Sequence, residues 1–216
     1  MSQADETILL EGLDDAIANT QADFGNIQLL DTATGDLRIV AQRGFPQWWL
    51  DYWDAVAEGQ GACGTALERG EPVIVEDVEH SPIFVGTPAL EVQLKAGVRA
   101  VHSQPLISRA GVRIGILSIH FREPLQPDQH AMRLLKAIAR NIADVVALGR
   151  SEQLLKNRQQ QFRLFMSAAS IVTFEWDIQK NRISRPFSSE LALPETTQGP
   201  GTFEDVVERI HPEDRE

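Results

Sequence analysis

Residues 59–77 have the sequence Gly-Gln-Gly-Ala-Cys-Gly-Thr-Ala-Leu-Glu-Arg-Gly-Glu-Pro-Val-Ile-Val-Glu-Asp. Three glycines, at positions 59, 61 and 64, allow left-handed turns. Residues 65–69 then predict a short helix, and the β-branched run at residues 73–75 predicts a buried strand. A glycine-rich entry to a helix can cradle a phosphate, but no Gly-Lys-Ser or Gly-Lys-Thr follows here. We therefore favour a structural turn that carries the chain beneath a cavity.

The composition limits the classes of function. The chain has 216 residues, 43% of them hydrophobic, which is enough for one buried core and a second unit. A formal net charge of −11 argues against nucleic acid as a partner, because phosphate neutralisation needs clustered lysine and arginine. No apolar run is long enough to span a membrane, and residues 1–6 do not resemble a secretory signal. The single cysteine, Cys63, can close no intrachain disulfide, so we expect a cytoplasmic protein.

Hydrophobic periodicity predicts helices and strands along most of the chain. The predicted helices cover residues 7–18, 47–57, 65–69, 88–96 and 129–165, and the predicted strands cover residues 24–30, 37–43, 73–75, 98–107 and 112–121. The last of these strands is apolar almost throughout, which indicates a central position in a sheet with both faces covered. Asp128 stands where the N-cap of the long helix is expected.

The predicted helix at residues 47–57 carries Trp48, Trp49 and Trp53, three of the four tryptophans of the chain. Such a cluster can line a ligand pocket or cover the core, because an indole buries a large area and keeps one N–H donor. Aromatic residues at helical spacing are more often core, and we favour that interpretation.

The order of these elements, together with four motifs, resembles the GAF domain, a ligand-sensing module of bacterial signalling proteins. The motifs are Gly59-Gln-Gly-Ala-Cys-Gly-Thr-Ala-Leu67, Pro72-Val-Ile-Val-Glu-Asp-Val78, Ala96-Gly-Val-Arg-Ala-Val-His-Ser-Gln-Pro-Leu-Ile-Ser-Arg-Ala-Gly111 and Ile114-Gly-Ile-Leu-Ser-Ile-His-Phe121. The resemblance implies an α+β fold over residues 1–148, in which an antiparallel sheet has helices on one side and a pocket on the other. Within this family, the sequence is similar to the version of the domain found ahead of bacterial sensor histidine kinases.

The long helix at residues 129–165 predicts a dimerising rod. Apolar or register-setting residues recur in it every seven positions, at Leu134, Asn141, Leu148, Leu155 and Phe162, with Ile138 and Val145 between them. From this pattern we expect a homodimer. The alternative is a solvated linker helix over residues 149–165, because Glu152 and Gln159 interrupt the pattern.

Residues 166–216 resemble the first half of a PAS domain. Residues 173–177, Thr-Phe-Glu-Trp-Asp, are similar to its first strand, and residues 203–215 end on a matching His-Pro-Glu-Asp turn. The later strands of that fold have no counterpart here, and a half sheet leaves an unpaired edge. We therefore expect this domain to be incomplete and the chain to be part of a longer protein.

The candidate site is a pocket for a small ligand, with no cofactor or metal identified. Its candidate residues are Trp48, Trp53, Cys63, Phe84, His102, Ser118 and His120. His102 and His120 lie on adjacent predicted strands and are expected to face each other; a haem or metal could use either one, but no His-Glu-x-x-His or Cys-x-x-Cys spacing supports this. Cys63 precedes a helix, which can activate a thiol, although a buried structural role is the commoner one.

Three functions remain open. The first is a sensory input region that relays ligand binding through the long helix to a PAS domain and an absent output. A histidine kinase is the output we favour, ahead of a cyclic-di-nucleotide enzyme or a transcription regulator. The second is a stand-alone GAF enzyme that uses Cys63, as sulfoxide reductases of the GAF type do, although one thiol cannot form the disulfide of their cycle. The third is a dimerisation module whose pocket is filled core. The sequence contains no catalytic centre that we can assign.

Overall fold

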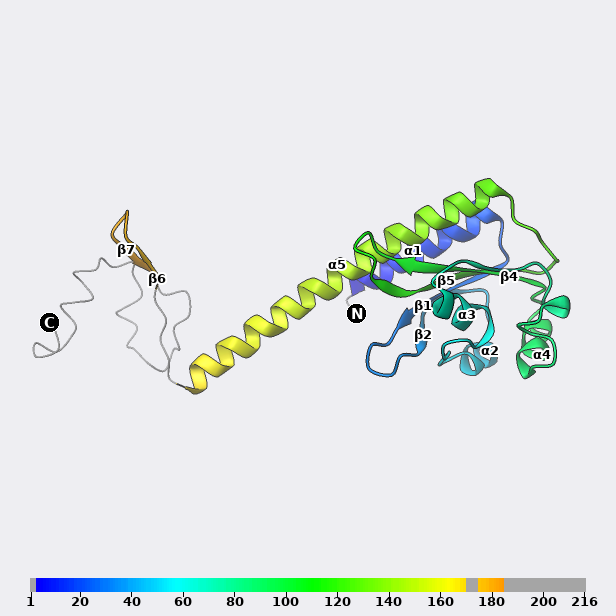
Figure 1. The fold of residues 1–216 in the computed structure, drawn as a ribbon, viewed down its shortest axis with the longest axis horizontal. Helices are drawn as coiled ribbons and strands as arrows, with labels where there is room; N and C mark the ends of the chain where they lie inside the picture. The colour runs from blue at the N-terminus through cyan, green and yellow to red at the C-terminus, as the bar shows by residue number, and fades with distance from the viewer. Residues whose placement is uncertain (1–2, 170–174, 185–216) are drawn as a thin grey trace, which may run out of the picture. The chain divides into compact units, whose positions relative to one another are not determined.

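The computed structural model describes residues 3–169 and 175–184. The chain divides into two compact units, residues 1–150 and 151–216. The first unit is an α+β domain in which one sheet lies between two layers of helices (Figure 1). The predicted fold class is confirmed for this unit.

The sheet has five antiparallel strands in the order β2-β1-β5-β4-β3. Their bounds are β1 Phe24–Leu30, β2 Leu37–Arg43, β3 Val73–Val75, β4 Ala100–Ile107 and β5 Arg113–Phe121. The apolar strand β5 is central, as predicted, and its residues from Ile114 to Phe121 are all buried. Strand pairing places Asn26 opposite Ser118 and Val101 opposite His120, which fixes the face of every side chain.

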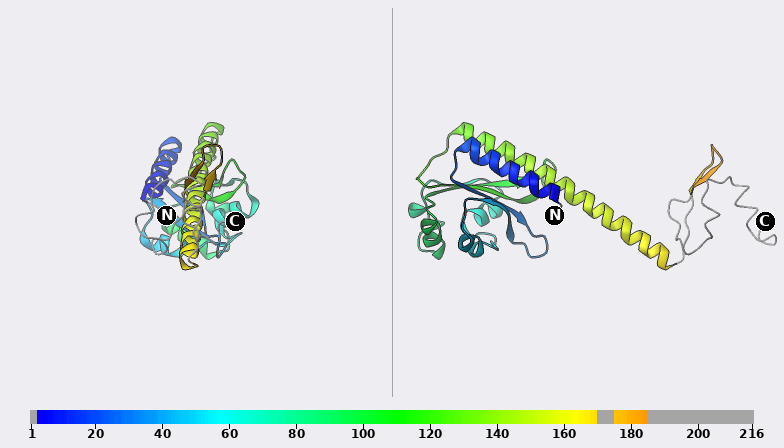
Figure 2. Two further views of the ribbon diagram at one scale, coloured as in Figure 1. Left: turned by 90° about the vertical axis from the view of Figure 1, so that its left-hand side faces the viewer. Right: turned by 180° about the vertical axis from the view of Figure 1, so that it is seen from behind.

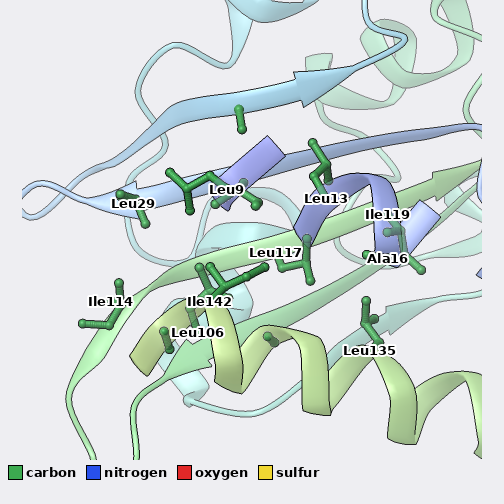
Figure 3. Packing of buried hydrophobic residues seen from close by; sticks show 14 of the residues in the cluster. Leu9, Leu13, Ala16, Leu29, Leu106, Ile114, Leu117, Ile119, Leu135 and Ile142 are labelled. Atoms are coloured by element: carbon green, nitrogen blue, oxygen red, sulfur yellow. The ribbon is translucent and has the colours of Figure 1, made fainter. Parts of the chain in front are cut away.

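One face of the sheet is covered by α1, Gln3–Thr20, and by the first part of α5, Gln129–Ala168 (Figure 2). Leu9 and Leu13 from α1 and Leu135 and Ile142 from α5 are each no more than 3% exposed, and they pack on the strands beneath (Figure 3). The helix α5 begins where the sequence indicates, because the backbone N–H of Ala131 donates to Asp128 Oδ1 at 2.6 Å.

The other face carries three short helices, α2 Gln47–Tyr52, α3 Gly61–Arg69 and α4 Pro88–Lys95, and the 3-10 turn η1 Val78–His80. The prediction of a helix to residue 57 is wrong, since α2 ends at Tyr52. Val56 instead exchanges two backbone hydrogen bonds with Leu37, at 2.9 and 3.0 Å, so the chain after Tyr52 runs along the sheet edge. Long-range strand pairing thus overrides the local helical periodicity.

The glycine-rich sequence also differs in detail from the prediction. Gly59 and Gly61 take left-handed backbone angles, φ +79° and +61°, but α3 begins at Gly61 and includes Gly64. Gly64 is needed for close approach, because a Cβ there would lie 2.2 Å from the carbonyl oxygen of Ala57. The helix ends at Gly70, whose φ of +67° is the left-handed conformation typical of a helix C-cap.

The second unit contains the C-terminal part of α5 and a hairpin of β6, Glu175–Asp177, with β7, Arg182–Ser184. The predicted PAS segment falls mostly outside the described residues, which omit 170–174 and 185–216. The PAS assignment therefore stays a prediction. Among the described residues, none of the helices combines the length and the apolarity that a membrane span requires.

Candidate functional site

The sheet face beneath α2, α3 and α4 is polar at its centre. Asn26 and Gln28 from β1 and Ser118 and His120 from β5 point to this face, and each is 1% exposed. They occupy alternate positions on two neighbouring strands, which places them side by side. A sheet centre that could hold four apolar side chains holds four polar ones.

Aromatic side chains form the cover above this polar centre. Trp49 is 2% exposed and stacks on Phe45, with ring centroids 3.6 Å apart and planes 8° from parallel. Its Nε1 donates to Gln93 Oε1 at 3.2 Å, which ties α2 to α4. The rings of Trp49 and His120 meet edge to face, with centroids 5.7 Å apart. The position of Trp49 is therefore fixed on three sides.

Together these groups enclose a small cavity. It is lined by Asn26, Gln28 and His120 from the sheet, by Trp49 and Trp53 from the α2 region, by Cys63 from α3, and by Phe84 and Gln93 near and on α4. The volume open to the centre of a water-sized sphere is about 10 Å³. That is room for about one water molecule.

Four buried polar atoms of this cavity have no hydrogen-bond partner in the protein. They are Asn26 Nδ2, Gln28 Oε1, Trp53 Nε1 and His120 Nδ1. An unsatisfied buried group costs about 1–3 kcal/mol, so four cost about 4–12 kcal/mol. A domain is stable by only about 5–15 kcal/mol in total. This concentration of unpaired groups, which a water molecule or a ligand would pair with, makes the cavity the candidate site.

Cys63 is held inside the site by two hydroxyl groups. Its Sγ lies 3.2 Å from Ser118 Oγ and 3.7 Å from Ser103 Oγ, and the two hydroxyls are 2.8 Å from each other. Burial raises the pKa of the Cys63 thiol, against the smaller lowering effect of the two serine hydrogen bonds. The thiol is therefore protonated at neutral pH and is a poor nucleophile.

The two strand histidines do not face each other, contrary to the prediction. His120 pairs with Val101 and His102 pairs with Ile119, so a shift of one residue puts the two rings on opposite faces of the sheet. Burial lowers the pKa of His120 to about 3, with a smaller contribution from the charge of His102. Burial likewise lowers the pKa of His102 to about 4, against a hydrogen bond to the backbone of Leu125.

The structure brings most of the predicted site residues together. Trp53, Cys63, Phe84 and His120 line the cavity, and Ser118 bonds to Cys63 beside it. His102 lies elsewhere: it lines a surface cleft of about 510 Å³ between the end of β5 and the start of α5.

Trp48 also lies away from the cavity. It is 36% exposed, with the Lys95 ammonium 4.5 Å from its ring.

Sequence reasoning missed Asn26, Gln28 and Gln93, and it favoured the core for Trp49, which lines the cavity. The first two carried a signal, because polar residues at alternate positions interrupt the apolar sequence Phe-Gly-Asn-Ile-Gln-Leu-Leu of β1. Gln93 carried none, since its role depends on the tertiary contact of α4 with α2. Within the described part of the chain, no three His, Cys, Asp or Glu side chains gather as metal ligands would.

The sequence of this chain is similar to that of a sensor protein, and its fold is similar to that of several solved GAF domains. A methyl sulfide methyltransferase-associated sensor of Methanosarcina acetivorans is 25% identical over 101 residues, which are 47% of this chain and 10% of that protein. The chain thus matches about a tenth of that relative's length.

Several solved structures have the same fold as this chain. A domain described as part of a two-component sensor histidine kinase from Sinorhizobium meliloti has a TM-score of 0.60 at 24% identity, over 72% of this chain and 99% of that one. A type II free methionine-R-sulfoxide reductase from Thermoplasma acidophilum has a TM-score of 0.55 at 18% identity, over 67% of this chain and 94% of that one. The family model of the GAF domain matches residues 3–147, and the chain therefore belongs to the GAF domain family.

Proposed function

We propose that this chain is the sensory input region of a signalling protein. The cavity beneath α2, α3 and α4 binds a small ligand, and α5 transmits the bound state. The observation that carries this proposal is the group of four unpaired polar atoms around one cavity. A ligand that pairs with them recovers free energy only in the arrangement that it binds, and this preference shifts a two-state equilibrium.

The central strand β5 supplies a direct route from the cavity to α5. His120 faces the cavity, while Ile119 and Phe121, its neighbours in sequence, belong to the core under α1 and α5. The strand then continues through residues 122–128 into α5. A shift of β5 on binding therefore acts on the base of α5 through covalently adjacent residues.

The exposed side of α5 supports the proposal of a homodimer. Leu148 and Leu155, seven residues apart, are 62% and 59% exposed, whereas Ile142 and Ala143 on the other side of the helix are buried in the core. Apolar side chains at heptad spacing pair with a second helix of the same kind. The double variant Leu148→Glu, Leu155→Glu should sediment as a monomer with an unchanged circular dichroism spectrum, while Lys156→Glu should remain a dimer. A wild-type monomer would contradict the dimer.

The output lies beyond the GAF domain. A PAS domain over residues 166–216 and a cytoplasmic histidine kinase after it remain the assignment that we favour. The sensor of Methanosarcina acetivorans and the domain from a two-component sensor histidine kinase among the solved structures support a signalling context.

An enzyme that uses Cys63 is the second candidate, because solved neighbours include methionine-R-sulfoxide reductases. The protonated, doubly hydrogen-bonded thiol and the single cysteine of the chain argue against it. Cys63→Ser separates the two candidates: a sensor keeps its fold and has no turnover to lose, whereas an enzyme of this kind loses all turnover of free methionine sulfoxide. Turnover by the wild type that the variant lacks would favour the enzyme.

Native mass spectrometry tests the sensory function. The chain is purified from its own host, and one part is extracted under denaturing conditions and refolded. We expect a small-molecule mass in the first sample, its loss in the second, and a difference in amide exchange between them over residues 129–150. Equal masses and equal exchange would favour the third possibility, a dimerisation module with a filled core.

A further inference from the structure

We propose that the cavity selects an uncharged, planar molecule whose edge carries both hydrogen-bond donors and acceptors, of the amide, ureide or nucleobase kind. This inference rests on the proposed sensory function and adds the chemical class of the ligand. It follows from the pattern of unpaired groups, from the charge of the lining and from its shape.

The unpaired atoms comprise two donors and two acceptors. Asn26 Nδ2 and Trp53 Nε1 carry hydrogen and can only donate, while Gln28 Oε1 can only accept. The role of His120 follows from its partner: Nε2 lies 3.4 Å from Asn26 Oδ1, an acceptor, so Nε2 carries the proton and Nδ1 is left as an acceptor. A matching ligand therefore offers acceptors to two groups and donors to the other two, as the edge of an amide or a nucleobase does.

The lining holds no ionised side chain. Among the described residues that surround the cavity there is no lysine, arginine, aspartate or glutamate. His120 is neutral at physiological pH because burial lowers its pKa to about 3, and the Cys63 thiol is protonated because burial raises its pKa. A phosphate, carboxylate or ammonium group would lose its hydration here without gaining a counter-charge.

Two indole rings in the cavity wall would offer an aromatic face to a flat ring once Trp53 is displaced. Trp49 and Trp53 present indole rings with centroids 6.1 Å apart and planes inclined by 49°. Trp49 is held by Phe45, Gln93 and His120. Trp53 is 5% exposed and contacts the rings of Trp49 and Tyr52, but the connection that follows it to α3 is largely exposed. The present space accommodates about one water molecule, so a ring enters only as Trp53 moves. Displacement of Trp53 is therefore part of the proposal.

Two matched pairs of probes test the ligand class on the full chain. Nicotinamide and nicotinate share a ring and differ in the charge of one substituent, and uracil and orotate differ by one carboxylate. The indole N–H resonances of Trp48, Trp49 and Trp53 are followed by ¹⁵N NMR during each titration. We expect at least one of the neutral probes to shift the Trp53 signal and to leave that of Trp48 in place, while its anionic partner shifts neither.

The chain offers a matched control for the binding groups. Gln28 and Gln104 each bury an unpaired Oε1, but Gln104 lies on the opposite face of the sheet, under the helices. Gln28→Met should weaken binding of the neutral probe about tenfold, since one hydrogen bond is lost. Gln104→Met should leave binding unchanged and shows that methionine in a central strand is tolerated.

The outcomes separate the ligand class from the sensory function. Equal or tighter binding of the anionic partner at Trp53 would overturn the ligand class and leave the sensory function standing. Absence of binding by both neutral probes would likewise overturn the class, whereas the sensory function depends on the mass spectra described above. A shift of the Trp48 resonance alone would place binding outside the cavity and would also overturn the proposed ligand class.

Discussion

The two buried histidines should make the GAF domain less stable at mildly acidic pH. His102 and His120 are each 1% exposed, and burial lowers their pKa values from 6.5 to about 4 and about 3. Above about pH 7.5 both are almost entirely neutral in the folded and the unfolded chain, so they cause little pH dependence there. As the pH falls below 6.5, the unfolded chain takes up protons that the folded domain does not, and stability is lost until the folded pKa values are reached.

The size of the effect follows from the shifts. Between its unfolded and its folded pKa, each histidine lowers the free energy of unfolding by about 1.4 kcal/mol for every unit that the pH falls. Between about pH 7.5 and about pH 5.5, each contributes a loss of about 1.4 kcal/mol, and the two together about 2.7 kcal/mol. Carboxyl groups titrate mainly below this range and add little to the difference.

Urea denaturation at these two pH values, followed by tryptophan fluorescence, measures the loss. His102→Gln and His120→Gln should each remove about half of the pH-dependent difference, whatever they do to stability at neutral pH. His130→Gln, at an exposed position near the start of α5, should retain all of it. The reasoning is refuted if the wild type is equally stable at both pH values, or if the two buried variants keep the full difference.

Two predictions concern packing, and both are measured by urea denaturation. Gly64→Ala should lower the free energy of unfolding by more than about 3 kcal/mol, because its Cβ would meet the backbone carbonyl of Ala57. Gly12→Ala should cost less, since its Cβ meets side-chain atoms of Ile142, Cγ1 and Cδ1, rather than backbone, and alanine favours the helix; equal losses would contradict this. Leu135→Ala, in the core under α5, should cost about 2–5 kcal/mol, and a loss below about 1 kcal/mol would mean that α5 is not packed as described.

The strand pattern was predictable from sequence because it depends on local periodicity. The bounds of β1 and β2 agree with the prediction, and β5 is central because only a strand covered on both faces is apolar at nearly every position. Where the prediction was wrong, a long-range contact decides the structure. The pairing of Val56 with Leu37 ends α2 early. The start of α3 is set locally instead, by the backbone hydrogen bond from Gly64 N–H to the carbonyl of Gln60.

The site was predictable only in part for the same reason. Cys63 and His120 stand out by residue type, but which face a strand residue occupies depends on pairing register. His102 and His120 differ in this respect although both lie on central strands. Trp48 and Trp49 are neighbours in sequence, and only the packing of α2 determines that Trp49 is buried and Trp48 is not.

The two faces of the same strands give the strongest argument that the cavity is a site rather than ordinary core. On the helix side, β1 and β5 present Ile27, Leu29, Leu117 and Ile119, which belong to the buried hydrophobic core. On the cavity side, the alternating positions hold Asn26, Gln28, Ser118 and His120. Stability alone favours apolar side chains at the second set as much as at the first. The helix side also buries two polar side chains, His102 and Gln104, but they belong to β4, and four of the six unpaired buried side-chain atoms among the described residues surround the one cavity. This concentration of donors and acceptors supports the proposal that the cavity serves recognition.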